Sequence, residues 1–258
     1  MNNSTVKITF LGTGTSSGVP MIGCNCAVCT SADVKDNRLR SSILVNTPDF
    51  TFVIDSGPDF RYQMLRSKTN TLNAILFTHP HKDHIAGLDD IRAYNYLMKM
   101  PMNVYANAMT NEALKKDFYY AFAEHKYPGV PDIILNTIDE TPFTIGNIHI
   151  QPILVWHHKM PVYGYRFNDF TYITDANRID DDQKEKIKGS KVLVLNALRR
   201  EKHISHFTLS EAIALAEELE IPEVYFTHIS HQLGIHEEVE AELPAHIHLA
   251  YDGLVINI

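Results

Sequence analysis

Short apolar runs separated by polar turns recur along the whole chain, and they predict many β-strands. In the first part of the chain these runs occupy 6–12, 42–46, 51–55, 72–78 and 102–106. In the second part they occupy 147–155, 162–167, 170–174, 191–198, 223–228 and 248–258. Residues 47–50 separate two neighbouring runs and predict a hairpin turn.

Helices are predicted between several of these strands. Apolar residues at helical spacing predict helices over 84–100, which stops before Pro101, and over 208–220. The second of these begins with a capping box formed by Thr208 and Glu211. A polar helix over 180–189 ends at Gly189, and a helix over 110–118 has Thr110 as its predicted N-cap.

The alternation of strands and helices predicts an α/β fold. The chain has 258 residues, and no linker or low-complexity segment marks a boundary, so we predict a single domain over 1–258. Residues 121–142 are the least regular stretch, and they predict a surface loop that acts as a lid. Two segments, 75–81 and 224–231, end an apolar strand with Phe-Thr-His and add another histidine. Ligand sites of α/β folds lie at such strand ends.

Composition narrows the choice of function. Hydrophobic residues make up 45% of the chain, but no apolar run approaches ~20 residues, so we expect no transmembrane helix. The formal net charge of −8 argues against binding of long nucleic acid, although a few local cations suffice for a small phosphorylated substrate. The odd count of three cysteines and the absence of a secretory signal in residues 1–12 predict a reducing, cytoplasmic location.

The segment THPHKDHIAG carries the strongest chemical signal. It contains the pattern H-x-H-x-D-H, formed by His79, His81, Asp83 and His84. Imidazole and carboxylate are ligands for zinc and similar metals. His79 and His81 are two apart in an extended segment and project to the same side. Four residues that can bind metal, within a stretch of six, predict two metal ions rather than one.

This pattern, after an apolar strand and before Gly87, resembles the metallo-β-lactamase superfamily of binuclear metallohydrolases. The resemblance implies a four-layer αββα sandwich of two mixed β-sheets flanked by helices. It covers nearly the whole chain. Asp55, at the end of a strand, resembles the early aspartate that supports the ligand loop from behind.

The resemblance also implies the ligands of the two catalytic metals. The first metal takes His79, His81 and His157, with His158 as the open alternative to His157. The second takes Asp83, His84 and His228, and Asp175 bridges the two. Zinc and manganese both fit such ligands.

The cysteine cluster GCNCAVC resembles the PhnP-like phosphodiesterase branch, whose members begin with a similar LGTG segment. In that branch, three cysteines and a histidine three residues after the last catalytic histidine hold a structural zinc. The matching residues are Cys24, Cys26, Cys29 and His231, a closed Cys₃His set without an open position.

The resemblance to this branch implies a binuclear metal-dependent phosphodiesterase. Its hydroxide, bridging the metals, attacks phosphorus, Asp83 orients it, and His206 serves the leaving oxygen, with His203 as its competitor. The implied substrate is a small cyclic ribose phosphate, as for phosphoribosyl cyclic phosphate phosphodiesterases. A homodimer is a reasonable expectation.

Three alternatives stay open. The first is a transfer-RNA 3′-processing endonuclease, and the second is a thioesterase or lactonase of the same superfamily, which has no need of His206. The third is a non-catalytic binding protein on the same fold. Five cations are candidates for binding phosphate: Arg38, Arg40, Arg92, Lys159 and Arg166.

Overall fold

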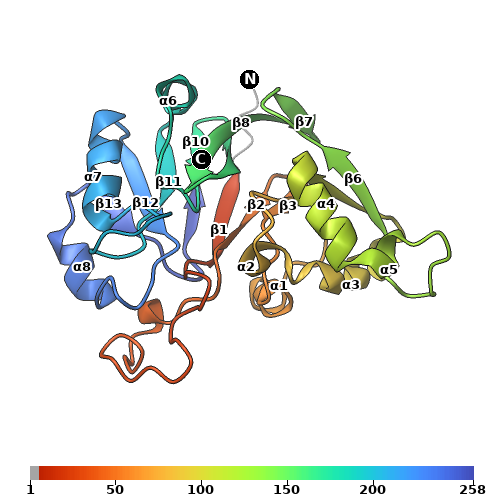
Figure 1. Ribbon diagram of the computed structural model, residues 1–258, viewed down its shortest axis with the longest axis horizontal. Coiled ribbons are helices and arrows are strands. Elements are labelled where there is room, and N and C mark those ends of the chain that lie inside the picture. The colour runs from red at the N-terminus through yellow and green to blue at the C-terminus, as the bar shows by residue number, and fades with distance from the viewer. Residues whose placement is uncertain (1–5) are drawn as a thin grey trace.

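The computed structural model describes residues 6–258. Part of the segment 1–12, for which we predict no secretory signal, therefore lies outside the described residues. Two seven-stranded β-sheets form the centre, and helices cover their outer faces (Figure 1). The predicted four-layer αββα sandwich is therefore confirmed. Within residues 6–258, no helix has the length and apolar character needed to cross a membrane.

The first sheet has the strand order β14-β1-β2-β3-β4-β5-β6. Its pairs are antiparallel from β14 to β3 and parallel from β3 to β6. The strands span Lys7–Gly12 (β1), Ser42–Asn46 (β2), Thr51–Ile54 (β3), Ala74–Leu76 (β4), Met102–Ala106 (β5), Ile133–Thr137 (β6) and Val255–Asn257 (β14).

The second sheet has the order β13-β12-β11-β10-β9-β8-β7. It is antiparallel from β7 to β10 and parallel from β10 to β13. The strands span Phe143–Ile145 (β7), Ile148–His157 (β8), Met160–Phe167 (β9), Phe170–Tyr172 (β10), Val192–Asn196 (β11), Glu223–Thr227 (β12) and Ile247–Leu249 (β13).

Helices of the first half of the chain cover the first sheet, and the later helices lie beside the second sheet (Figure 1). The first group comprises α1 (Phe60–Ser67), α2 (Lys82–Ile85), α3 (Arg92–Met98), α4 (Ala108–Asp117) and α5 (Tyr119–Phe122). The second group comprises α6 (Asp181–Ile187), α7 (Leu209–Glu218) and α8 (His236–Glu242). Short 3₁₀ helices span Val34–Asp36 (η1) and Leu88–Ile91 (η2).

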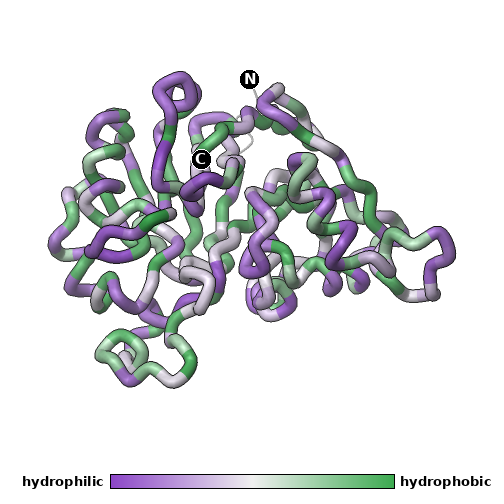
Figure 2. Tube along the Cα trace, in the orientation of Figure 1, coloured by the Kyte–Doolittle hydropathy of each residue, from purple (hydrophilic) through white to green (hydrophobic). Residues whose placement is uncertain are grey.

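Strand periodicity builds the layers. In β3, Phe52 and Ile54 belong to the core between the sheets, whereas Val53 packs with the apolar residues of the first helical layer. In β11, Val194 lies in the core between the sheets and Leu193 packs with α7. Alternate residues of a strand point to opposite faces, so strands that are apolar throughout serve two cores at once. Figure 2 shows the hydrophobic positions gathered in the central strands, with the hydrophilic α6 outside them.

The predicted helix over 84–100 is wrong as a single element. It is divided into the last part of α2, then η2 and α3. The N–H of Gly87 donates to the carbonyl of Ser56 at 2.8 Å instead of continuing the helix. A Cβ atom at Gly87 would lie 2.0 Å from the carbonyl oxygen of Gly57, so this contact requires glycine.

Two other predictions need correction. The stretch 121–142 is not a single loop, because α5 ends within it and β6 pairs in parallel with β5. The final run 248–258 is two strands, β13 and β14, which belong to different sheets. Between them Gly253 has φ of +94°, and the Asp252 carboxylate accepts bonds from Thr13 and from the N–H of Leu39.

The N-cap of α4 is Asn107 rather than the predicted Thr110. The Asn107 side chain accepts a hydrogen bond from the N–H of Thr110 at 2.8 Å. The predicted capping box of α7 is confirmed, with Thr208 and Glu211 bonded reciprocally.

Replacing the two residues separately tests this cap. Asn107→Ala is expected to lower the free energy of unfolding by about 1 kcal/mol, because it removes the cap. Thr110→Val is expected to be neutral or stabilising, since the buried Thr110 hydroxyl has no hydrogen-bond partner among the described residues. Urea unfolding measures both changes. A larger loss in Thr110→Val than in Asn107→Ala contradicts the assignment.

Candidate metal centre

Histidines and aspartates from separate segments meet where strands of both sheets end. The predicted ligands His79 and His81 follow β4, Asp83 and His84 lie in α2, and His157 ends β8. Asp175 follows β10, and His228 directly follows β12. Parallel strands present their carboxyl ends at one edge, so residues distant in sequence converge there.

Three residues at strand ends have left-handed backbone conformations: Asp55, which supports the ligands, and the ligands Asp175 and His228. The φ angles are +65° at Asp55, +55° at Asp175 and +55° at His228. Asp and His tolerate this region better than most residues, but each still costs free energy that the surrounding packing offsets. Such a conformation turns the chain sharply at the end of a strand. Its recurrence at three segments that meet in one place indicates a functional site.

The first cluster contains three histidines. The Nε2 atom of His79 lies 3.0 Å from Nδ1 of His81. The ring of His157 lies 5.7 Å from that of His79 and 5.1 Å from that of His81. Nδ1 of His157 donates to the carbonyl of Ser205 at 2.9 Å, which leaves Nε2 as the free nitrogen. His158 is exposed and has φ of +57°.

The second cluster contains Asp83, His84, Asp175 and His228, and one ligand atom from each lies within 4.8 Å of all the others. Nε2 of His84 is 3.2 Å from Asp83 Oδ2 and 3.2 Å from Asp175 Oδ2. Nδ1 of His228 is 3.1 Å from Asp175 Oδ2.

Asp175 lies between the two clusters. Its Oδ2 contacts His84 and His228, whereas Oδ1 lies 3.9 Å from Nε2 of His79. Oδ1 also lies 3.9 Å from Nδ1 of His206. One buried carboxylate thus faces both groups of imidazoles, which is the geometry that a bridging ligand needs.

The charges of the site suit a cation. Burial opposes ionisation of Asp175, but the imidazoles of His228, His84 and His79 outweigh it and hold the pKa of Asp175 well below its usual value. Burial lowers the pKa of His79 well below normal, so this ring is neutral and has a nitrogen lone pair to offer. Nε2 of His84 is buried and lies 3.2 Å from a carboxylate oxygen of Asp83 and from one of Asp175, without the alignment of a hydrogen bond to either. This donor set fits divalent metal ions.

Asp55 supports the cluster from behind and is wholly buried. Its Oδ2 accepts from Nδ1 of His84 at 2.7 Å and from the Thr78 hydroxyl at 2.8 Å. Its Oδ1 accepts from the N–H of Thr78 at 2.9 Å. Thr78 Oγ1 in turn lies 2.9 Å from Nδ1 of His79. These bonds fix the two rings with Nε2 toward the site.

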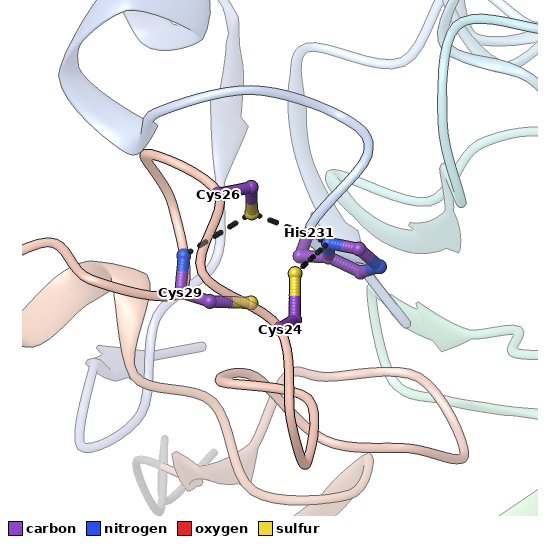
Figure 3. Close-up of side chains that lie close together, drawn as sticks. All are labelled: Cys24, Cys26, Cys29 and His231. Atoms are coloured by element: carbon purple, nitrogen blue, oxygen red, sulfur yellow. Dashed lines mark hydrogen bonds between the residues drawn. The ribbon is translucent and has the colours of Figure 1, made fainter.

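Figure 3 shows the four residues of the cysteine cluster turned toward one another. Their ligand atoms all lie within 4.8 Å of one another, and Nδ1 of His231 is 3.5 Å from Cys24 Sγ and 3.4 Å from Cys26 Sγ. A tetrahedral zinc with bonds of about 2.3 Å to sulfur and 2.0 Å to nitrogen places these atoms roughly 3.5 Å apart. The N–H of Cys29 and the ring of His231 lower the pKa of the Cys26 thiol to about 6. The set fits a zinc ion.

The cysteine segment is joined to the histidine edge. The N–H of Thr15 donates to the carbonyl of Ile229, and Ile229 donates to that of Thr13. Thr15 Oγ1 lies 3.2 Å from Nε2 of His228. Thr15 is not among the residues predicted from the sequence to belong to the site. It directly follows the LGTG segment that resembles the PhnP-like branch, and this position could have identified it.

The two further histidines also lie at the site. His206 precedes α7, is 8% exposed, and its ring lies 4.6 Å from His157 and 4.9 Å from His228. Its Nδ1 is buried without a hydrogen-bond partner in the described chain. Burial lowers the pKa of His206 to about 3, so the ring is neutral. His203 is half-buried, 5.0 Å from the His206 ring, and its Nδ1 lies 3.3 Å from Ser205 Oγ.

Four of the five candidate cations are committed to other partners. Arg38 is buried against Thr13, the carbonyl of Ala250 and His236. Arg40 pairs with Asp59, and Arg92 pairs with Asp89. Arg166 donates to the carbonyls of Lys186 and Lys188. Within residues 6–258, Lys159 forms no ion pair.

The comparisons agree with the fold. The sequence profile of the Beta-lactamase superfamily domain matches residues 51–229. A solved structure described as a new diphosphatase from the PhnP family has a TM-score of 0.93 and 40% identity, over 98% of this chain and 97% of that one.

Two curated relatives are longer proteins. An octanoyltransferase of Porphyromonas gingivalis is 36% identical over 252 residues, 96% of this chain and 51% of the relative. A ribonuclease Z of Nostoc sp. is 30% identical over 171 residues, 62% of this chain and 46% of the relative. The chain therefore spans about half the length of these two relatives.

Removing the buried support tests the centre. Asp55→Asn is expected to weaken binding of the catalytic metals about 10- to 100-fold, because the amide keeps only one acceptor oxygen and its NH₂ group must then face a donor of His84 or Thr78. Competition with a metal-binding dye measures the affinity. Asp49→Asn, in the exposed hairpin turn, is the matched control. Equal affinities in the two variants contradict this role of Asp55.

Proposed function

The chain belongs to the beta-lactamase superfamily, with the features of its PhnP-like members, and we propose that it is a binuclear metal-dependent phosphodiesterase. The observation that carries the proposal is the position of Asp175 between the two clusters, with one oxygen toward each. A protein that only bound a ligand has no need of two adjacent sites that share a buried carboxylate. The neighbouring His206 adds a polar group suited to a leaving oxygen.

We assign the ligands as follows. His79, His81 and His157 hold the first divalent metal, because His157 rather than the exposed His158 approaches the other rings. Asp83, His84 and His228 would hold the second, and Asp175, which lies between the two sets of ligands, would serve both. When bound, zinc or manganese supplies Lewis acidity that activates a water and offsets negative charge on the phosphate.

The side chains of the chain do the remaining work. The Asp83 carboxylate is ionised, because the neighbouring His84 outweighs the effect of burial and keeps its pKa low. It accepts a hydrogen bond from the attacking water and so orients it. The neutral His206 ring donates a hydrogen bond to the departing oxygen, where negative charge develops. The hydrogen bonds of Asp55 and Thr78 hold the rings of His84 and His79 in position.

The substrate that we favour is a small phosphodiester, with a cyclic ribose phosphate as the leading candidate. The PhnP-family neighbour is named a diphosphatase, which supports chemistry at a small phosphorylated molecule. The ribonuclease Z relative keeps transfer-RNA processing as the second candidate. The net charge of −8 favours the small substrate, since binding of long RNA relies on neutralising phosphates.

We also propose that Cys24, Cys26, Cys29 and His231 hold a structural zinc. This ion braces the cysteine segment against the strand end that carries His228, through the pairing of Thr13 and Thr15 with Ile229. It takes no part in the reaction, since four protein ligands leave no open position.

Metal content distinguishes the two kinds of site. Elemental analysis is expected to find about three metal ions per chain, of which a mild chelator removes about two and leaves the thiolate-bound zinc. Cys26→Ser is expected to lose the retained ion as well. A correctly folded wild-type protein that retains no ion after this treatment contradicts the structural-zinc assignment.

Leaving-group dependence tests His206. His206→Ala is expected to lower kcat/KM about 100-fold for methyl phenyl phosphate, with metal content unchanged. The loss is smaller for methyl 4-nitrophenyl phosphate, since nitrophenolate departs without a donor. His203→Ala is the matched control.

Equal losses for the two esters in His206→Ala contradict a role at the leaving oxygen. A wild-type protein that hydrolyses a thioester far faster than either phosphate ester, with no effect of His206→Ala, supports the thioesterase alternative instead.

A further inference from the structure

A cavity of about 570 Å³ adjoins the candidate metal centre. His81 and His157 form part of its wall, so a molecule held at the first metal site extends directly into it. Another cavity, of about 610 Å³, lies between β1 and α1 and contains none of the candidate ligands. Of these two cavities, the one lined by His81 and His157 is therefore the one that a substrate at the metal centre would enter.

Apolar side chains dominate the rest of its wall. Met109 comes from the start of α4, Met160 and Pro161 from the start of β9, and Ile204 from the loop before α7. Met109 is 40% exposed and Ile204 is 67% exposed. Single exposed apolar residues are common, but here residues of three separate segments line one cavity beside a polar centre. Methionine side chains adapt to ligands of irregular shape.

The cavity lies on the side of the leaving group. Ser205 belongs to its wall and directly precedes His206, the residue to which we assign the leaving oxygen. The carbonyl of Ser205 also accepts the hydrogen bond from His157. A substituent bonded to the departing oxygen near His206 therefore lies beside the cavity that Ser205, Ile204 and Met160 line.

We propose that this cavity binds an apolar leaving group of the substrate, such as an aliphatic chain or an aromatic ring, and thereby determines specificity. The inference rests on the proposed phosphodiesterase function, and within it favours an aryl or alkyl phosphodiester over the cyclic ribose phosphate, whose departing oxygen stays on a polar sugar. Burial of the substituent removes the exposed surfaces of Met109 and Ile204 from water together with its own.

Lys159 completes the cavity as its one cationic lining residue among those described. It forms no ion pair within residues 6–258, in contrast to the four committed arginines. The chain is acidic overall, so an uncompensated cation beside the metal centre attracts the phosphate of an approaching substrate. Lys159 thus contributes to binding of every phosphodiester, whatever its leaving group.

A pair of esters isolates the apolar contribution. Methyl phenyl phosphate and methyl 4-butylphenyl phosphate release phenols of nearly equal acidity, so they differ mainly in apolar area. Each fully buried methylene changes an equilibrium by about fourfold. The wild-type enzyme is expected to prefer the butyl ester by at least about tenfold in kcat/KM, since the chain is partly buried.

Variants place the preference in the cavity. Met109→Gln and Ile204→Asn are expected to reduce the tenfold preference to about threefold or less. Met100→Gln is the control, because Met100 is 41% exposed, much like Met109, and does not line the cavity. Lys159→Gln is expected to lower kcat/KM about three- to tenfold for both esters and to leave their ratio unchanged.

A binding measurement tests the apolar cavity separately from the phosphodiesterase function. Calorimetry of the metal-loaded protein is expected to show at least about tenfold tighter binding of 4-butylphenylphosphonate than of phenylphosphonate. If both esters are hydrolysed equally well, or if Met109→Gln and Ile204→Asn leave the preference unchanged, the inference is overturned and the phosphodiesterase function stands. If neither ester is hydrolysed while the phosphonate preference holds, the phosphodiesterase function fails and the apolar cavity stands.

Discussion

The structure depends on one buried carboxylate, that of Asp175, and on the groups that compensate its charge. The side chain is 2% exposed, so water does not solvate it. The imidazoles of His79 and His84, of His206 and of His228 come from three other segments and surround it, and their removal would leave an uncompensated anion in the interior. A pair of divalent cations meets the same requirement more strongly. The need to neutralise this charge thus connects the architecture to the proposed chemistry.

The arrangement of the two sheets brings the groups that compensate this charge to Asp175. Each sheet delivers ligands from the carboxyl ends of its strands, and the left-handed residues Asp55, Asp175 and His228 turn the chain there. The second candidate site, the cysteine cluster, reaches the same edge through Thr15, which contacts His228. One end of the sandwich therefore combines the candidate metal centre, the cysteine cluster and the apolar cavity, while the three cores supply rigidity.

Local patterns predicted the elements that local physics determines. The His79–His84 motif, the capping box at Thr208 and the strand alternation all depend on neighbours in sequence, and the structure contains each of them. The break at Gly87 depends on a contact with Gly57, and the separation of β13 from β14 depends on bonds between Asp252 and the distant Thr13 and Leu39. Neither contact is visible in a short window of sequence. The residues that line the apolar cavity come from four segments of the chain, and only the fold brings them together.

Anomalous diffraction from crystals of the metal-loaded protein is the most direct test of the central claim. The account predicts two peaks about 3.5–4 Å apart with Asp175 between them, and a third peak enclosed by the three cysteines and His231. A single peak that does not contact Asp175, or full occupancy of the cysteine site with no metal near His79 and His84, would contradict it.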